Sequence, residues 1–169
     1  LNFDIELNEK AKIKKISFLG KKIYKDRKLR NIIISEEYKF WKIISGKKYL
    51  NENLINFDKR LLRNFYLNKG YYDVRINSSF AKLIDDDGFE LVFNIDANNK
   101  FYFGNLSLDI PTDFDNNNFN SLNKVFEKLK NKPYSINSVE NIINEIDKIA
   151  ISEQYEAIQA LVKEDIVDN

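Results

Sequence analysis

An internal repeat is the feature that most constrains the fold of this 169-residue chain. When residue 93 is placed over residue 3, FNIDANNK at residues 93–100 falls on FDIELNEK at residues 3–10. A repeat of this length indicates tandem copies of one structural unit. We therefore expect residues 1–8 to be the tail strand of a preceding unit and residues 9–97 to be a complete unit. Residues 98–169 should form a second unit that lacks its last strand.

The first part of the complete unit has the pattern of one strand followed by two helices. Residues 12–19 alternate as a short strand, and Asp26 is placed to cap a helix that continues to about Glu37. Asn53 can cap a second helix, which Gly70 can end in the left-handed conformation. We expect the second helix to bury a stripe formed by Leu54, Phe57, Leu61 and Phe65, broadened by Leu62 and Tyr66.

Two strands should complete this unit. Residues 73–84 and 89–97 have the composition of strands, joined by an acidic turn that ends at Gly88. Residues 89–97 are apolar at every second position, which is typical of a sheet with one covered face. Within residues 73–84 the apolar positions change parity near Phe80, which predicts a bulge and a place at the sheet edge. Such an edge can accept an added strand from a partner, or it can be inert.

The second unit repeats this plan less clearly. A strand is expected over residues 101–110, and another should begin within residues 157–162. Two helices should lie between them, separated by Pro133, with Ser135 or Ser138 as the cap of the second helix. Their apolar stripes would be Phe119, Leu122, Phe126 and Leu129, and then Val139, Ile142, Ile146 and Ile149.

Composition narrows the chemistry that the chain can perform. The sequence has no cysteine and no histidine, which removes thiol nucleophiles, the commonest general base and the usual ligands of zinc. We therefore predict no enzyme activity, no catalytic residue, no bound metal and no cofactor. No apolar run approaches the roughly 18 residues of a membrane-spanning helix. The chain begins in the middle of a strand-like pattern without methionine, so we expect it to be a piece of a larger protein.

Charge is distributed unevenly along the chain. The net charge is only +1, but basic residues are in excess in the first half and acidic residues in the second. The basic excess is densest between Lys10 and Arg30. Such a segment can bind nucleic acid or anionic lipid, although a solvated surface is the commoner explanation. A nucleic-acid-binding module is therefore one alternative function.

Two stretches of the first unit carry a resemblance to a known family. They are LGKKIYKDRKLRNII at residues 19–33 and the segment from FWKIISGKKY to GYYDVRI at residues 40–76. Their spacing of aromatic, leucine and glycine residues resembles the POTRA domains of bacterial outer-membrane β-barrel assembly factors. The matching residues are Tyr49, Leu54, Leu61, Leu62, Phe65, Tyr66, Gly70 and Tyr71. The long loop containing Phe40 and Trp41 is similar to that of a third POTRA unit, and residues 98–169 would then be the fourth.

The resemblance implies an α+β fold of tandem POTRA units. Each unit would have the order β-α-α-β-β, with a three-stranded mixed sheet covered on one face by two antiparallel helices. The implied function is that of a non-enzymatic periplasmic scaffold in a Gram-negative outer-membrane protein. Its partners would be unfolded outer-membrane proteins, the lipoproteins of the assembly complex, neighbouring POTRA units and a C-terminal membrane barrel, with no nucleic acid. The related translocation-and-assembly and two-partner secretion transporters, whose POTRA units look similar, are the alternative within the family.

Two candidate sites follow from this resemblance. The first is an edge strand that would bind clients by β-augmentation, through Val74, Arg75, Ile76, Asn77, Ser78, Ser79 and Phe80. The second is the loop with Phe40 and Trp41, where Trp41 either anchors the loop against the helices or docks a partner.

Overall fold

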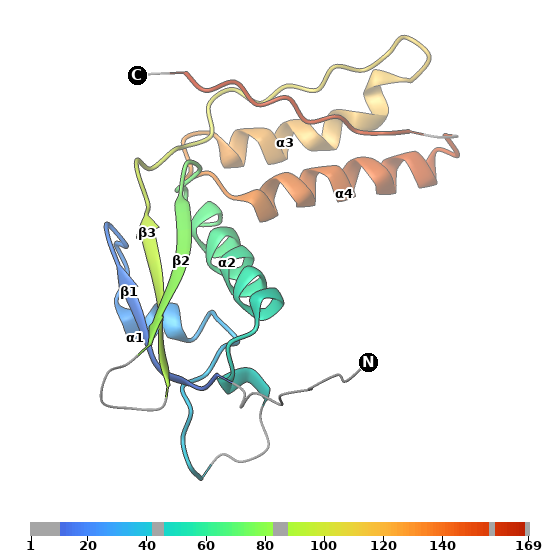
Figure 1. Cartoon of the computed structure of the whole chain (residues 1–169). Coiled ribbons are helices and arrows are strands. Elements are labelled where there is room, and N and C mark those ends of the chain that lie inside the picture. The colour runs from blue at the N-terminus through green and yellow to red at the C-terminus, as the bar shows by residue number, and fades with distance from the viewer. Residues whose placement is uncertain (1–10, 42–45, 83–87, 156–157, 168–169) are drawn as a thin grey trace, which may run out of the picture. The chain divides into compact units, whose positions relative to one another are not determined.

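The chain forms two compact units (Figure 1). The computed structural model describes residues 11–41, 46–82, 88–155 and 158–167. The first unit comprises residues 1–67 and 71–99, and the second comprises residues 68–70 and 100–169. The tail strand expected over residues 1–8 lies outside the described residues, and the boundary at residue 97 stays a prediction.

The first unit has the expected order of one strand, two helices and two strands. Its elements are β1 (Ile13–Leu19), α1 (Asp26–Arg30), the 3₁₀ turn η1 (Gly46–Lys48), α2 (Glu52–Leu67), β2 (Arg75–Lys82) and β3 (Phe89–Asp96). The sheet order is β1-β3-β2, with β3 parallel to β1 and antiparallel to β2. The predicted α+β class and mixed three-stranded sheet are confirmed.

One apolar core joins this sheet to its helices. Alternate residues of β3 are fully buried, as the sequence pattern predicts, and the ring of Phe93 stacks on Phe18 of β1 with centroids 5.6 Å apart. Leu29 of α1 and Leu62 and Tyr66 of α2 belong to the same buried cluster. Both helices therefore pack on one face of the sheet.

The first helix is shorter than predicted. It ends at Arg30 rather than near Glu37, because the chain beyond it finds other hydrogen-bond partners. The backbone N–H groups of Ile34 and Ser35 donate to the buried carboxylate of Asp58, at 2.6 and 3.1 Å. The predicted cap is also wrong, since Lys25 holds the N-cap position without a side-chain bond and the Asp26 carboxylate accepts from Lys22.

The second helix begins earlier than predicted, and its buried positions agree only in part with the predicted stripe. Asn51, not Asn53, caps it by accepting the Leu54 N–H at 3.1 Å. The buried positions are Ile55, Asp58, Leu62, Tyr66 and Leu67, so Leu62 and Tyr66 are confirmed and the other members of the predicted stripe are not fully buried. Gly70 follows the helix with φ +93°, so the predicted left-handed ending is confirmed.

The predicted bulge near Phe80 is wrong. Strand β2 pairs with β3 residue by residue, from Arg75 opposite Asp96 to Lys82 opposite Phe89. The irregularity of the sheet lies in β1, between Ile13 and Lys15. Strand β2 is nevertheless an edge strand, as expected, and the turn at residues 83–87 lies outside the described residues.

The second unit is built around two helices. The 3₁₀ turn η2 (Asn116–Phe119) leads into α3 (Asn120–Leu129), and α4 (Ile136–Ser152) follows Pro133. The Ser135 hydroxyl accepts the Ser138 N–H at 3.3 Å, which confirms one of the two predicted caps.

The strands expected in the second unit are absent from its described residues. Residues 101–103 pair briefly with residues 131–134, where the Phe103 N–H donates to the Lys132 carbonyl at 2.9 Å and the Tyr134 N–H donates to the Phe101 carbonyl at 3.0 Å. Residues 104–110 and 158–162 run as extended chain without a ladder (Figure 1). Their apolar side chains pack instead against the core of the helix pair, which accounts for the alternating pattern. The packed side chains include Leu108, Ile110, Ile158 and Ala160.

Candidate functional site

Strand β2 offers an open edge. In a strand paired on one side only, every second residue directs its backbone N–H and C=O away from the sheet. Within the described part of the chain, no hydrogen bond occupies these outward groups between Arg75 and Lys82. Val74, the first of the predicted site residues, does not belong to this edge, because its side chain is buried and its carbonyl accepts from Arg63 at 3.1 Å.

The side chains along β2 leave this edge accessible. Asn77 and Ser79 are exposed, and Ile76 and Ser78 are half-buried on the alternate positions. The Phe80 ring is 61% exposed and meets Phe89 of the neighbouring strand edge to face, with centroids 6.0 Å apart. The edge therefore combines small polar side chains with one exposed aromatic ring.

The opposite edge of the same sheet is closed by the last residue of α1 and the chain that follows it. On β1, the Ile16 N–H donates to the Glu37 carboxylate at 3.0 Å, and Arg30 donates to the Ile16 carbonyl at 2.7 Å. Arg30 and Glu37 also pair with each other, and the Tyr38 N–H donates to the Ile13 carbonyl at 2.6 Å. These contacts supply β1 with the hydrogen bonds that a further strand would otherwise make.

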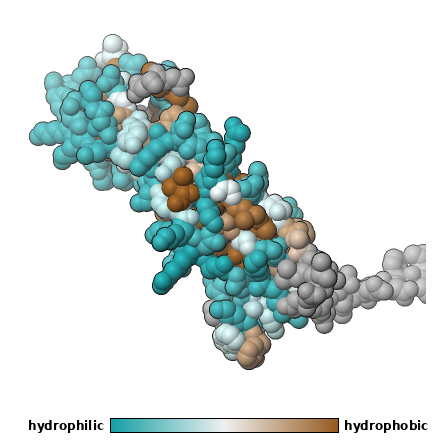
Figure 2. Space-filling view, turned by 90° about the vertical axis from the view of Figure 1, so that its left-hand side faces the viewer, coloured by the Kyte–Doolittle hydropathy of each residue, from teal (hydrophilic) through white to brown (hydrophobic). Residues whose placement is uncertain are grey.

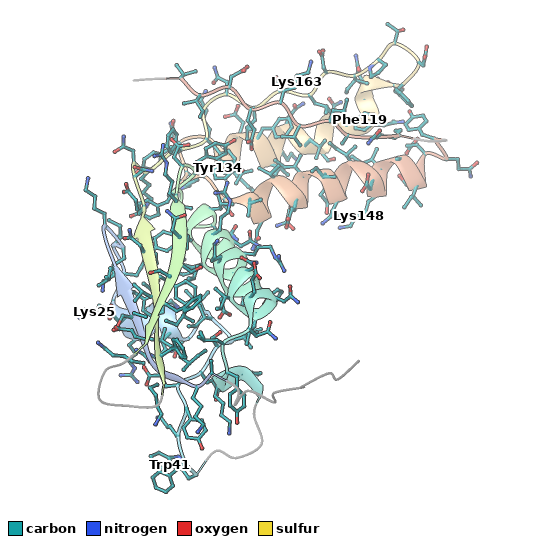
Figure 3. The ribbon with its side chains drawn as sticks, in the orientation of Figure 1. Lys25, Trp41, Phe119, Tyr134, Lys148 and Lys163 are labelled. Atoms are coloured by element: carbon teal, nitrogen blue, oxygen red, sulfur yellow. The ribbon has the colours of Figure 1, made fainter. Side chains whose placement is uncertain are left out.

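The aromatic side chains of Phe40 and Trp41 are exposed. Phe40 is 76% and Trp41 63% exposed, and their rings meet edge to face with centroids 4.6 Å apart. The Lys39 ammonium lies 5.8 Å from the Trp41 ring centroid. Trp41 points away from the strands and helices of its unit (Figure 3), so the expectation that it anchors the loop against the helices is wrong. Elsewhere on the face shown in Figure 2, hydrophobic residues form small patches among hydrophilic ones.

Several basic residues of the first unit are neutralised locally. Lys15 lies 3.0 Å from Glu90, and Lys22 pairs with Asp26. The pKa of Glu90 is lowered, first by the hydrogen bond from the Ser17 hydroxyl and then by Lys15. These pairs reduce the charge that the segment from Lys10 to Arg30 can offer to a phosphate backbone.

A cluster of basic residues on α2 is not among the sites predicted from the sequence. Lys59, Arg60 and Arg63 lie with Asn56 on one side of α2 and line a groove beside β2. The spacing i, i+3, i+4, i+7 marks one face of a helix and could have identified them.

The described residues contain no arrangement suited to a metal and no membrane-spanning helix. No group of three or more acidic side chains within them is placed to hold a metal ion. No helix described here is long and apolar enough to cross a membrane.

The sequence comparisons identify one family. The model of the POTRA family, described as "Surface antigen variable number repeat", matches residues 11–98, which is more than half of the chain. The chain is 33% identical over 111 residues to the outer membrane protein assembly factor BamA of Neorickettsia risticii, covering 63% of this chain. It is 28% identical over 115 residues to BamA of Neisseria meningitidis, covering 66% of this chain. The matches span 15% and 14% of the lengths of these relatives.

Solved structures share the fold at low sequence identity. The Haemophilus influenzae BamA POTRA3-5 structure superposes with a TM-score of 0.58 at 12% identity, covering 82% of this chain and 50% of that one. POTRA1-2 of the periplasmic domain of Omp85 from Anabaena superposes with a TM-score of 0.55 at 10% identity, covering 95% and 91%. The chain therefore belongs to the POTRA family and is similar to part of the outer membrane protein assembly factor BamA.

Proposed function

We propose that the chain is part of a periplasmic scaffold for outer-membrane protein assembly and binds unfolded outer-membrane proteins by β-augmentation at β2. The observation that supports this proposal is the difference between the two edges of one sheet. The outer edge of β1 is closed by Arg30, Glu37 and Tyr38, whereas the outward groups of β2 have no partner among the described residues. An extended client chain can pair with these groups whatever its side chains, because the bonds are made by the backbone.

The expected strength of this pairing suits transient binding. Each net hydrogen bond contributes about 0.5–1.5 kcal/mol, and an added strand along β2 would make about four to six of them. Ordering an unfolded segment offsets much of this gain. The result is weak and reversible capture, as handover of a client requires.

The loop with Phe40 and Trp41 is the second part of the proposal. Exposed aromatic pairs are frequent anchors at protein interfaces, because large rings bury apolar area at a low cost in conformational entropy. We assign this loop to docking of accessory lipoproteins. The names of the curated relatives support an assembly factor rather than a transporter, and we keep the assignment to third and fourth POTRA units as a proposal.

The test is a backbone-amide NMR titration of the 169-residue chain with an eight-residue peptide copied from an outer-membrane barrel strand. The control peptide has the same side chains but N-methyl groups on alternate backbone nitrogens, on the edge that would face β2. Shifts along residues 75–82 with the first peptide, and none with the second, are expected. Equal shifts with both peptides, or shifts confined to β1, would refute pairing at β2.

A further inference from the structure

A basic groove runs beside the open edge. Asn56, Lys59, Arg60 and Arg63 of α2 line one side of it, and residues 74–77 line the other. The positions on α2 are separated by three, one and three residues, so these side chains project from one face of the helix. An added strand on β2 would direct every second side chain towards this face.

The cations of this groove are not neutralised within the described structure. Lys59, Arg60, Arg63 and Arg75 form no ion pair there, in contrast to Lys15, Lys22 and Arg30. No acidic residue is among the residues that line the groove. The groove therefore presents positive charge beside the open edge, without an acidic residue in its lining.

Arg63 is held at the start of the open edge. Its Nη1 donates to the Val74 carbonyl at 3.1 Å, immediately before β2 begins. A guanidinium has five N–H donors, so this bond leaves others available for a carboxylate. Arg60 is oriented differently, since its guanidinium carbon lies 5.4 Å from the Phe57 ring centroid. The groove thus contains Arg63, held beside the edge by its bond to Val74, together with Arg75 on β2 and two further cations on α2.

We propose, resting on the proposed function of β2, that this groove selects added strands with acidic side chains at alternate positions. The occupant is an extended peptide segment with Asp or Glu at positions i and i+2 on the side that faces α2. Two such side chains stand about 6.6 Å apart along a strand. Lys59 and Arg63 are separated by about 6 Å along the helix axis. The spacings match closely enough for two ion pairs to form together.

The test compares three peptides that differ only at these two positions. Each is an eight-residue strand-forming peptide with blocked ends, carrying Glu, Gln or Lys at i and i+2. Isothermal titration with the 169-residue chain should give the order Glu, Gln, Lys from tightest to weakest. The Glu peptide should bind about fivefold more tightly than the Gln peptide, as two exposed ion pairs of ordinary strength imply. This ratio should fall towards one in 0.5 M salt, where the Debye length is only a few ångströms.

Charge reversal on α2 identifies the cations responsible. The variant Lys59→Glu/Arg63→Glu should prefer the Lys peptide, and Arg60→Glu, which leaves the Arg63 bond to Val74 intact, should weaken the preference for Glu. The matched control is Lys124→Glu/Lys128→Glu on α3, two exposed lysines with the same spacing on another helix. This control should retain the preference of the unaltered chain.

The outcomes separate this proposal from the function on which it rests. Equal affinity for all three peptides, with NMR shifts along β2, would overturn acidic selection and leave strand addition intact. An absence of shifts along β2 with every peptide would overturn strand addition itself. Preference for Glu that survives charge reversal on α2 would also overturn the assignment of the groove.

Discussion

Replacing Asp58 with alanine should strongly destabilise the first unit. This carboxylate is fully buried in α2 and accepts the backbone N–H groups of Ile34 and Ser35, at 2.6 and 3.1 Å. These bonds join residues more than twenty positions apart and hold the chain after α1 against the second helix. Alanine would leave both backbone donors without their partner.

The size of the effect follows from these two bonds. A hydrogen bond to a charged group contributes about 1.5–3 kcal/mol, so losing both should cost about 4 kcal/mol of unfolding free energy. Asparagine keeps one carbonyl oxygen but turns an NH₂ group towards the other donor. Asp58→Asn should therefore cost about half as much, roughly 2 kcal/mol. Domains of this size are stable by only about 5–15 kcal/mol, so the alanine variant should be close to unfolding.

Urea denaturation followed by circular dichroism measures the change, and hydrogen exchange at Ile34 and Ser35 localises it. The matched control is Asp26→Asn, which removes the exposed ion pair with Lys22 at i, i+4. Such pairs contribute only about 0.3–0.5 kcal/mol. If Asp58→Ala and Asp26→Asn lowered stability equally, or if exchange at Ile34 and Ser35 did not accelerate, the role given to Asp58 would be wrong.

Three further predictions concern a glycine, a tyrosine and a glutamate. Gly20→Ala should lower the free energy of unfolding by more than about 1 kcal/mol, because φ is +85° and a Cβ would lie 2.4 Å from a carbonyl oxygen of β3. Gly46→Ala is the control, since a Cβ there meets open space and should change the stability in urea little. Burial is the main cause that raises the pKa of Tyr66 above 10.0, so the folded chain keeps this proton longer than the unfolded chain and its stability should fall as pH rises above 10. This fall should be less steep in Tyr66→Phe, which has no proton to lose there. The pKa of Glu90 is lowered, first by the Ser17 hydroxyl, so Ser17→Ala should raise it in a carboxyl NMR titration and weaken the loss of stability below pH 4.5.

Each of these three predictions can be contradicted by a specific result. Equal stability of the two glycine variants would contradict the close approach at Gly20. An unchanged slope between pH 9 and 11 in Tyr66→Phe would show that Tyr66 titrates alike in the folded and unfolded chain. An unshifted Glu90 titration in Ser17→Ala would assign the lowered pKa to Lys15 instead.

Elements with a strong local signal could be predicted from the sequence. The alternation in residues 89–97 predicts β3 and its buried face, because a sheet covered on one side requires this pattern. Gly70 and Ser135 mark a helix end and a helix start through their own backbone and side-chain chemistry. The position of β2 at the edge was also predicted, although the bulge used to argue for it is absent.

Features that depend on distant partners could not be predicted. The early end of α1 depends on Asp58, which receives backbone bonds from a segment more than twenty residues away. This acidic residue occupies a core position of α2 that hydrophobicity assigns to solvent. The extended segments at residues 101–110 and 158–162 have strand-like patterns, but a pattern cannot reveal whether a pairing strand is present.

Only the position of the candidate site could be predicted from the sequence, because its remaining features also depend on distant residues. The sequence gives the location of an edge, but whether that edge is open depends on contacts elsewhere. The side chains that close β1 come from Arg30 and Glu37, beyond the strand itself. The basic groove likewise requires α2 and β2 to lie together, which only the fold establishes.

The most direct test of strand addition at β2 is a set of cross-strand nuclear Overhauser effects between an isotope-labelled client peptide and the 169-residue chain. The account predicts contacts from alternate peptide residues to the backbone protons of residues 75–82, in one continuous register. Contacts to β1, or only to Phe40 and Trp41, would contradict the claim that the open edge of β2 binds the client.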